Sequence, residues 1–172
     1  MRVKFTGDFK KLNKWGQKLQ KAPDALKVVS RQMAEETIEL IRDGIEDGRD
    51  PYGEPYAPLK LRDGRPLQDT GRMKVWERRA VTASGFTVQS PVQYAIYHQR
   101  GTGIYGPTKR PIKPVKAQAL RIPVRGGNPI FVQKVAGTPQ RRMVPEGGRL
   151  PSKWRDRYVE VANEVLAAHF EE

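Results

Sequence analysis

The sequence contains no cysteine, only two histidines and no long apolar run. Without cysteine the chain has no disulfide framework, no thiolate ligand for a metal and no thiol nucleophile. His98 and His169 lie 71 positions apart, so a histidine-based metal site has few ligands available. No stretch approaches the roughly 20 apolar residues of a membrane-spanning helix, and the first residues lack the apolar core of a secretory signal. We therefore expect no membrane contact, no metal and no cofactor.

Length and composition favour a single domain over residues 1–172. The apolar fraction is 37% and the mean hydropathy is −0.70, which is lean for a chain that must build its whole core alone. Two independent cores would each be small at this length. Apolar residues still recur with clear periods, which a disordered chain lacks. The sequence predicts a folded domain with exposed arms that complete their folding against partners.

Positive charge is concentrated in one part of the chain. The formal net charge is +13, from 32 Lys and Arg against 19 Asp and Glu, yet no acidic residue occurs between Glu77 and Glu146. Such a segment repels itself unless it faces a polyanion or an acidic protein surface. A second interpretation is an exposed hairpin whose cations protect sheet edges from mispairing. Twelve cations fall in this gap: Arg78, Arg79, Arg100, Lys109, Arg110, Lys113, Lys116, Arg121, Arg125, Lys134, Arg141 and Arg142.

Apolar periodicity predicts three helices. The first covers residues 9–19 and ends before Pro23, because proline cannot continue a helix. The second begins at Pro23, a favoured first-turn residue, and closes at Asp47–Gly48 with a favoured C-terminal glycine. Its apolar face is wide enough to lie across a sheet. This face comprises Leu26, Val29, Met33, Ala34, Ile38, Leu40, Ile41 and Ile45. The third helix begins at Ser152, and its apolar face comprises Trp154, Tyr158, Val161, Val165 and Ala168.

Alternation and turn residues predict strands. Residues 1–6 alternate between apolar and polar side chains, as in a short strand. Residues 81–90 contain a Ser-Gly turn and predict a hairpin. Two β-prone runs within residues 119–135 flank a Gly-Gly-Asn turn and predict a second hairpin. Pro123 in the first of these runs indicates an edge strand.

Two other segments complete the organisation. Residues 49–71 carry four prolines and predict an ordered or partner-ordered loop without regular structure. Tyr94–His98 is too short to assign from its period. Residues 100–142, which include the second hairpin, are expected to extend from the domain as a basic arm.

The sequence patterns associated with catalysis or cofactor binding lack the neighbouring residues that such sites need. Residues 101–106 match the letters of the GxGxxG dinucleotide fingerprint, but prolines follow where a helix should begin and no acidic residue lies about 20 positions on. We expect a flexible glycine-rich loop there. His98 has neither a nucleophile elbow nor a local acid, so we expect an interface or core histidine. The carboxylate row Glu35, Glu39 and Asp43 is expected to be a solvated helix face.

Aromatic residues accompany the acid-free segment. Nucleic-acid binding by stacking and phosphate contact would use such a combination. No zinc-finger spacing, aromatic RNA-binding motif or clear helix-turn-helix is present. The sequence therefore supports non-specific phosphate contact without sequence readout. The aromatic residues are Tyr94, Tyr97, Tyr105 and Phe131.

Several motifs together resemble those of a known family. Residues 50–59 read Asp-Pro-Tyr-Gly-Glu-Pro-Tyr-Ala-Pro-Leu, and residues 65–73 read Arg-Pro-Leu-Gln-Asp-Thr-Gly-Arg-Met. Residues 94–101 read Tyr-Ala-Ile-Tyr-His-Gln-Arg-Gly, and residues 137–145 occupy the place of a further Pro-Arg motif. From about residue 25 to residue 165, the chain resembles the virion-morphogenesis, or tail-completion, proteins of Mu-like tailed phages.

The resemblance implies residues that serve assembly, and no catalytic, cofactor-binding or metal-binding residue. The motif positions are Asp50, Pro51, Tyr52, Gly53, Pro55, Pro58, Leu59, Arg65, Pro66, Leu67, Asp69, Thr70, Gly71, Tyr94, Ala95, His98, Gln99 and Gly101. Contact with DNA or an acidic partner is expected from cations of the arm. These are Arg100, Lys109, Arg110, Lys113, Lys116, Arg121, Arg125, Lys134, Arg141 and Arg142.

The resemblance also implies a fold and a role. The expected fold is α+β, with a long helix packed on an antiparallel sheet, a basic β-hairpin arm and a C-terminal helix. The expected role is that of a non-enzymatic protein of the phage neck or upper tail, which forms a ring, commonly sixfold, completes the tail and joins it to the head connector. Expected partners are further copies, head-connector and tail proteins, and phage DNA. The protein would occupy the virion, and the host cytoplasm during assembly. The alternative is a small basic protein that binds nucleic acid non-specifically.

Overall fold

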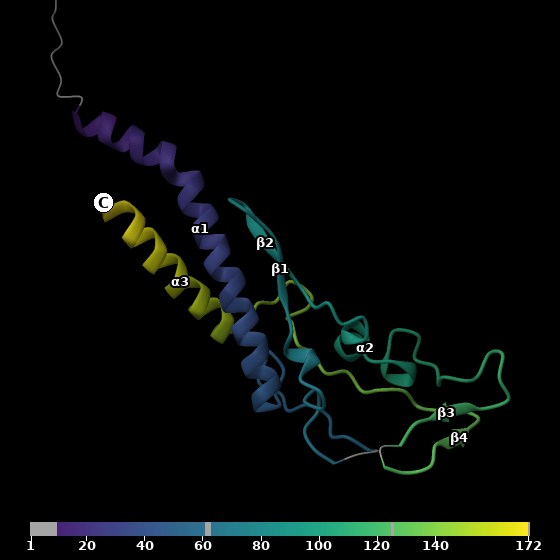
Figure 1. Ribbon diagram of the computed structural model, residues 1–172. Helices are drawn as coiled ribbons and strands as arrows, with labels where there is room; N and C mark the ends of the chain where they lie inside the picture. Colours follow the sequence, from purple (N-terminus) through teal and green to yellow (C-terminus); the bar gives the residue numbers. More distant parts are fainter. Residues whose placement is uncertain (1–9, 61–62, 125, 172) are drawn as a thin grey trace, which may run out of the picture.

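The computed structural model describes residues 10–60, 63–124 and 126–171 and has the predicted mixed α+β architecture (Figure 1). Its elements, in chain order, are α1 (Lys10–Asp47), the 3₁₀ turn η1 (Arg72–Lys74), β1 (Glu77–Thr82), β2 (Gly85–Gln89), α2 (Ala95–Arg100), the 3₁₀ turn η2 (Gly103–Tyr105), β3 (Leu120–Ile122), β4 (Ile130–Val132) and α3 (Ser152–Glu171). The strand predicted over residues 1–6 lies outside the described residues.

The long helix α1 is continuous over 38 residues, where the sequence predicts two helices. Pro23 lies inside it, so the prediction that the helix ends there was wrong. Proline has a helical φ, and it removes one hydrogen bond at a cost of about 3 kcal/mol. The helix tolerates this loss because Ala25 and Val29, just beyond the proline, are buried against the rest of the protein. The predicted end at Asp47 is confirmed, and Gly48 follows with a φ of 72°.

Strands β1 and β2 form the predicted hairpin, and it packs along α1. The two strands are antiparallel, with Val81 opposite Phe86 and Thr82 opposite Gly85. The register shifts between Arg78 and Ala80, which marks a bulge. An isolated two-stranded hairpin is only marginally stable, so its packing against α1 stabilises it.

The C-terminal helix α3 also packs along α1 and runs in the opposite direction (Figure 1). Trp154 and Val161 of its predicted apolar face are buried. Tyr158 lies edge-on to both Trp154 and Phe86 of β2, so α3 also touches the first hairpin. The Tyr158 hydroxyl and the Thr37 hydroxyl of α1 lie 2.6 Å apart. No helix within the described ranges is long and apolar enough to span a membrane.

One core cluster lies where the C-terminal half of α1 meets α3 and the loops. Ile41 and Ile45 of α1 are almost fully buried, as is Met143, which comes from the segment before α3. The loops contribute Tyr56, Leu67 and Met73 to the same cluster. The motif-bearing loops are therefore part of the core.

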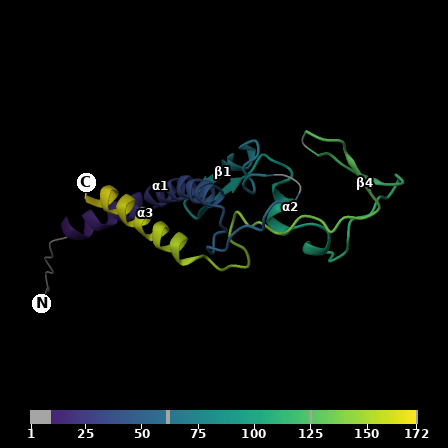
Figure 2. The ribbon, with the colours of Figure 1, turned by 90° about the horizontal axis from the view of Figure 1, so that it is seen from below.

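The second predicted hairpin, β3–β4, lies far from this core (Figure 2). Leu120 pairs with Val132 and Ile122 pairs with Ile130, around the turn that the sequence indicates. Pro123 follows directly after β3, at the end of a two-stranded sheet in which every strand is an edge.

Candidate functional site

The first motif forms a tight turn directly after α1. The Asp50 carboxylate accepts hydrogen bonds from the backbone amides of Tyr52, at 2.9 Å, and Glu54, at 3.0 Å. In such an Asx turn the side-chain carboxylate accepts from backbone amides that have no helical carbonyl to pair with. The turn continues with a β-bridge between Arg49 and Pro55. Gly53 has a φ of 90°, which explains why glycine follows Tyr52 in the motif.

The second motif covers the C-terminal end of α1. The last carbonyl groups of a helix have no partner within the helix. Arg65 donates to the carbonyl of Glu46 at 3.1 Å, and the Gln68 side chain donates to the carbonyls of Ile45 and Glu46. Leu67 between them is buried although its φ is 64°, so tertiary packing holds it in the left-handed region. These residues therefore close the helix with cations and amides.

Gln99 of the third motif fastens the segment before α3. Its side-chain oxygen accepts from the amides of Met143, at 2.8 Å, and Val144, at 3.2 Å. Its side-chain nitrogen donates to the Val144 carbonyl at 2.8 Å and to Glu146 at 2.9 Å. Gln99 is buried, with 7% of its surface exposed. A fully satisfied buried amide of this kind holds two distant segments in one register.

Two adjacent arginines tie the same segment to the first motif. Arg141 is buried and donates to the carbonyls of Ala57, at 2.9 Å, and Pro58, at 3.2 Å. Arg142 lies 3.6 Å from Asp50 and 3.7 Å from Glu146. Both were expected to contact DNA or an acidic partner. Arg141 is only 5% exposed, and Arg142 already faces two carboxylates.

Tyrosines of the first motif complete this network. The Tyr56 hydroxyl donates to the Arg142 carbonyl at 2.9 Å. Burial raises the pKa of Tyr56, and the nearby Asp50 carboxylate raises it further. The Tyr52 hydroxyl lies 3.1 Å from the carbonyls of Glu146 and Arg149. Both phenols thus connect the first motif to the segment before α3 by hydrogen bonds.

Residues 101–106 and 136–140 form a backbone contact that we call the glycine clasp. The Thr102 amide donates to the Thr138 carbonyl at 2.9 Å, and the Ile104 amide donates to the Ala136 carbonyl at 2.8 Å. A Cβ on Gly103 would lie 2.0 Å from the Ala136 carbonyl oxygen, and one on Gly137 would lie 2.2 Å from that of Thr102. The expectation of a flexible loop here was wrong, because these glycines permit a close approach of two backbones.

From here on, the name basic arm denotes residues 107–135, the part of the predicted arm 100–142 that lies beyond the clasp. Ile112 and Val135 pair across its base, with hydrogen bonds of 2.9 and 3.0 Å. Val115 is 95% exposed and Phe131 is 64% exposed. Arg125 lies outside the described residues. None of the other arm cations forms an ion pair with a described residue: Lys109, Arg110, Lys113, Lys116, Arg121 and Lys134. Arg100, in α2, is likewise exposed.

His98 lies beside a pocket of about 290 Å³ in which the three motifs meet. Its Nδ1 atom is buried without a hydrogen-bond partner among the described residues, and its ring lies edge-on to Tyr94. Burial lowers the pKa of His98, and the positive charge of Arg141 lowers it further. The histidine is therefore neutral at pH 7. The remaining lining residues are Leu59, Leu67, Asp69, Thr70 and Met73.

The structure brings the three motifs together and leaves the arm cations apart from them. Ala95 is buried in the core, Gly71 (φ 73°) directly precedes η1, and Gly101 directly follows α2. Pro51 and Pro66 lie in the turns of the first two motifs. Sequence reasoning missed Glu146 and Gln140, whose side chains join the Gln99 network. Their hydrogen bonds to Gln99 span 47 and 41 positions, a separation that no local pattern in the sequence indicates.

Carboxylates of α1 take part in ion pairs. Within the described residues, no group of three or more His, Asp or Glu side chains lies close enough to hold a metal ion. The carboxylate row of α1 is partly neutralised, because Glu35 pairs with Arg78 and Glu39 pairs with Arg42. The Lys74 ammonium group lowers the pKa of Glu46 at the end of the same helix. Glu35 and Glu46 thereby connect α1 to β1 and η1, whereas the Glu39–Arg42 pair lies within α1.

Comparison with known proteins identifies the family. A family model described as the phage virion morphogenesis family matches residues 7–127, which include the first three motifs and most of the arm. The chain belongs to the phage virion morphogenesis family. No curated protein and no solved structure matches the chain.

Proposed function

We propose that the protein is a non-enzymatic structural subunit of the phage neck or upper tail. In this role it forms a ring, sixfold by analogy with the proteins it resembles, that completes the tail and joins it to the head connector. Membership of the phage virion morphogenesis family supports a role in building the virion. The motif residues support assembly over catalysis, because their polar side chains are used in hydrogen bonds that connect loops.

The observation that carries the proposal is the basic arm on its glycine clasp. An isolated two-stranded hairpin is only marginally stable in water. This one projects from the body with exposed cations, Val115 and Phe131, yet its base is fixed by backbone bonds. A fixed projection with apolar and cationic side chains suits a contact with another subunit or an adjacent ring.

Shortening the arm tests this role. Ile112 and Val135 already form a hydrogen-bonded pair, so replacing residues 113–134 by Asn-Gly gives a two-residue hairpin. The variant retains the clasp and should fold, as circular dichroism and thermal unfolding will report. Phage that carry only this variant should accumulate unjoined heads and tails. Normal numbers of infectious particles would exclude the proposed role for the arm.

The alternative is a basic protein that binds nucleic acid non-specifically. The described arm cations favour it because they form no ion pair with a described residue, and each phosphate contact that such cations make releases counterions and strengthens binding at low salt. A gel shift with duplex and single-stranded DNA at near-physiological salt separates the two functions. Micromolar or weaker binding that salt abolishes supports the structural role. Tight binding that the arm-shortened variant loses supports the alternative.

A further inference from the structure

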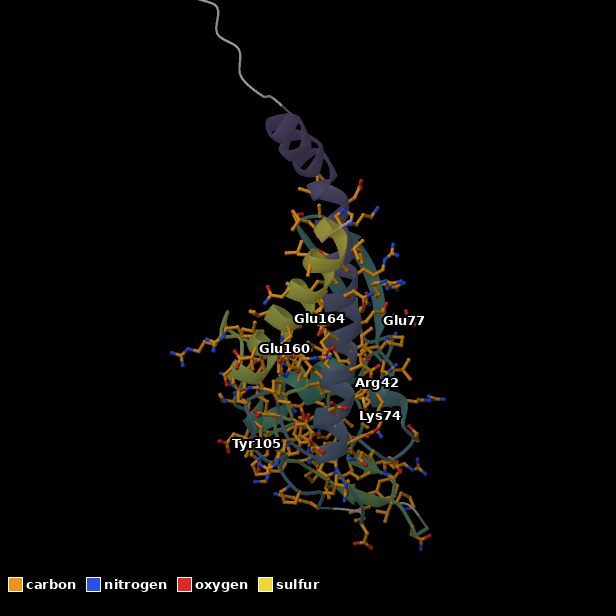
Figure 3. All side chains as sticks on the ribbon, turned by 90° about the vertical axis from the view of Figure 1, so that its left-hand side faces the viewer. Arg42, Lys74, Glu77, Tyr105, Glu160 and Glu164 are labelled. Carbon is orange, nitrogen blue, oxygen red and sulfur yellow. The ribbon has the colours of Figure 1, made fainter. Side chains whose placement is uncertain are left out.

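The arm has a candidate receptor on the same chain, in a groove between α1 and α3 that we call the acidic groove. Seven carboxylates and two cations line it. The carboxylates are Glu35, Glu36, Glu39 and Asp43 of α1 and Asp156, Glu160 and Glu164 of α3, and the cations are Lys153 and Arg157. Figure 3 shows Glu160 and Glu164 on α3, on the side where that helix lies beside α1. The groove is therefore negative on a protein whose net charge is strongly positive.

Some of this negative charge is already used within the chain. Arg157 contacts Glu36, at 2.8 Å, and Glu160, at 2.9 Å. Asp43 and Glu164, by contrast, form no ion pair with a described residue. Both are exposed, so their charge is directed to solvent or to a partner.

The floor of the groove is apolar. Val161 is buried there, and Val165 and Ala168 of α3 line the part nearest the C-terminus. A hairpin that entered the groove could place Val115 or Phe131 on this floor while its cations met the carboxylate walls. An apolar centre with a charged rim is the usual anatomy of a protein interface.

The arm cannot reach the groove of its own chain. In Figures 1 and 2 the β3–β4 hairpin lies at one end of the molecule and the paired helices α1 and α3 lie at the other. The clasp and the Ile112–Val135 pair fix the base of the arm in that position. A contact between the arm and the groove would therefore have to join two molecules.

We propose that the basic arm of one copy docks in the acidic groove of the next copy. The contact joins two different surfaces, so it is head-to-tail, and its repetition gives a ring when the rotation between neighbouring copies closes. This inference rests on the proposed function, and it adds the surface that receives the arm and the identity of the partner as a second copy of this chain.

A charge-swap experiment tests the docking. The arm variant Lys113→Glu/Arg121→Glu and the groove variant Asp43→Lys/Glu164→Lys change four exposed residues that form no ion pair within the described chain, so both should fold. Each variant alone should self-associate at least about tenfold more weakly than the wild type, because like charges then face each other. Sedimentation velocity and native mass spectrometry at low salt report the association.

Mixing the two variants gives the decisive measurement. In an alternating assembly each reversed arm meets a reversed groove and each unchanged arm meets an unchanged groove. The equimolar mixture should therefore recover oligomers with an even number of subunits, and native mass spectrometry should show equal numbers of each variant. The control Lys27→Glu/Asp24→Lys changes exposed charges of α1 that lie N-terminal to the residues lining the groove, and it should leave association unchanged.

Several results would overturn the docking. They are wild-type protein that stays monomeric at low salt, variants that associate like the wild type, and a mixture that recovers nothing. If association is unaffected but the arm-shortened protein still fails to join heads to tails, only the docking is wrong and the arm contacts a different protein. If the arm-shortened protein yields normal particles, the proposed function itself fails.

Discussion

The buried amide of Gln99 offers a sharp test of how the motifs build the fold. Substitution Gln99→Ala removes the acceptor that serves the amides of Met143 and Val144, and the donor that serves Glu146. Stranding a buried backbone amide costs about 1–3 kcal/mol, and the less buried bonds add less because water can replace the side chain. We expect a loss of about 2–4 kcal/mol in the free energy of unfolding.

Urea unfolding followed by tryptophan fluorescence measures this loss, since Trp154 is buried beside the affected segment. The exposed Gln93→Ala is the matched control and should change stability by less than about 0.5 kcal/mol. Gln99→Glu retains the acceptor, loses both donors and places a carboxylate near Glu146. The pKa of the introduced carboxyl group should be raised above the ordinary value of about 4.3, since Glu146 is near and the site is buried. The destabilisation relative to the wild type should therefore shrink as the pH falls toward that value. If Gln99→Ala behaves like Gln93→Ala, the Gln99 bonds do not hold the segment.

Three further predictions concern the clasp, the helix pair and the pocket. Gly103→Ala should lower the free energy of unfolding by at least about 3 kcal/mol, because its Cβ would meet the backbone of Ala136. Gly126 has a similar positive φ but open space around it, so Gly126→Ala should lower it by only about 1 kcal/mol. Equal losses in thermal unfolding would contradict a close backbone contact. A double-mutant cycle with Thr37→Val and Tyr158→Phe should give a coupling of about 1 kcal/mol, and additive effects would mean that the two hydroxyls do not bond. Because the folded pKa of His98 is lowered from 6.5, the unfolded chain takes up the proton first, so stability should fall as the pH drops below about 6.5. His98→Asn should remove that part of the pH dependence, and parallel pH profiles of the two proteins would refute it.

Local signals in the sequence predicted the elements that local interactions determine. The end of α1 at Gly48, the two hairpins and the face of α3 follow from glycines, turn residues and apolar periods. The break expected at Pro23 does not occur. The helix loses one hydrogen bond there, and the burial of Ala25 and Val29 just beyond it offsets this loss. Propensity is a weak guide where tertiary packing opposes it.

The candidate site was only partly predictable, because its contacts are distant in sequence. The motif residues could be named, but their role as mutual hydrogen-bonding partners could not. Arg141 looked like one more cation of the arm, yet its acceptors are carbonyls 83 and 84 positions earlier. Gly103 looked like part of a flexible loop because the backbone that it approaches follows more than 30 residues later. Backbone carbonyls carry no sequence signature, so such contacts are invisible without the fold.

The groups of the glycine clasp that attach the arm to the body differ from the groups with which the arm can bind a partner. The contacts of the clasp are between neutral backbone groups, which neither titrate nor respond to counterions. The exposed cations of the arm, in contrast, act over a distance of about 10 Å that shrinks as ionic strength rises. A change in ionic strength can therefore alter the affinity of the arm for a charged partner while the attachment of the arm to the body stays constant.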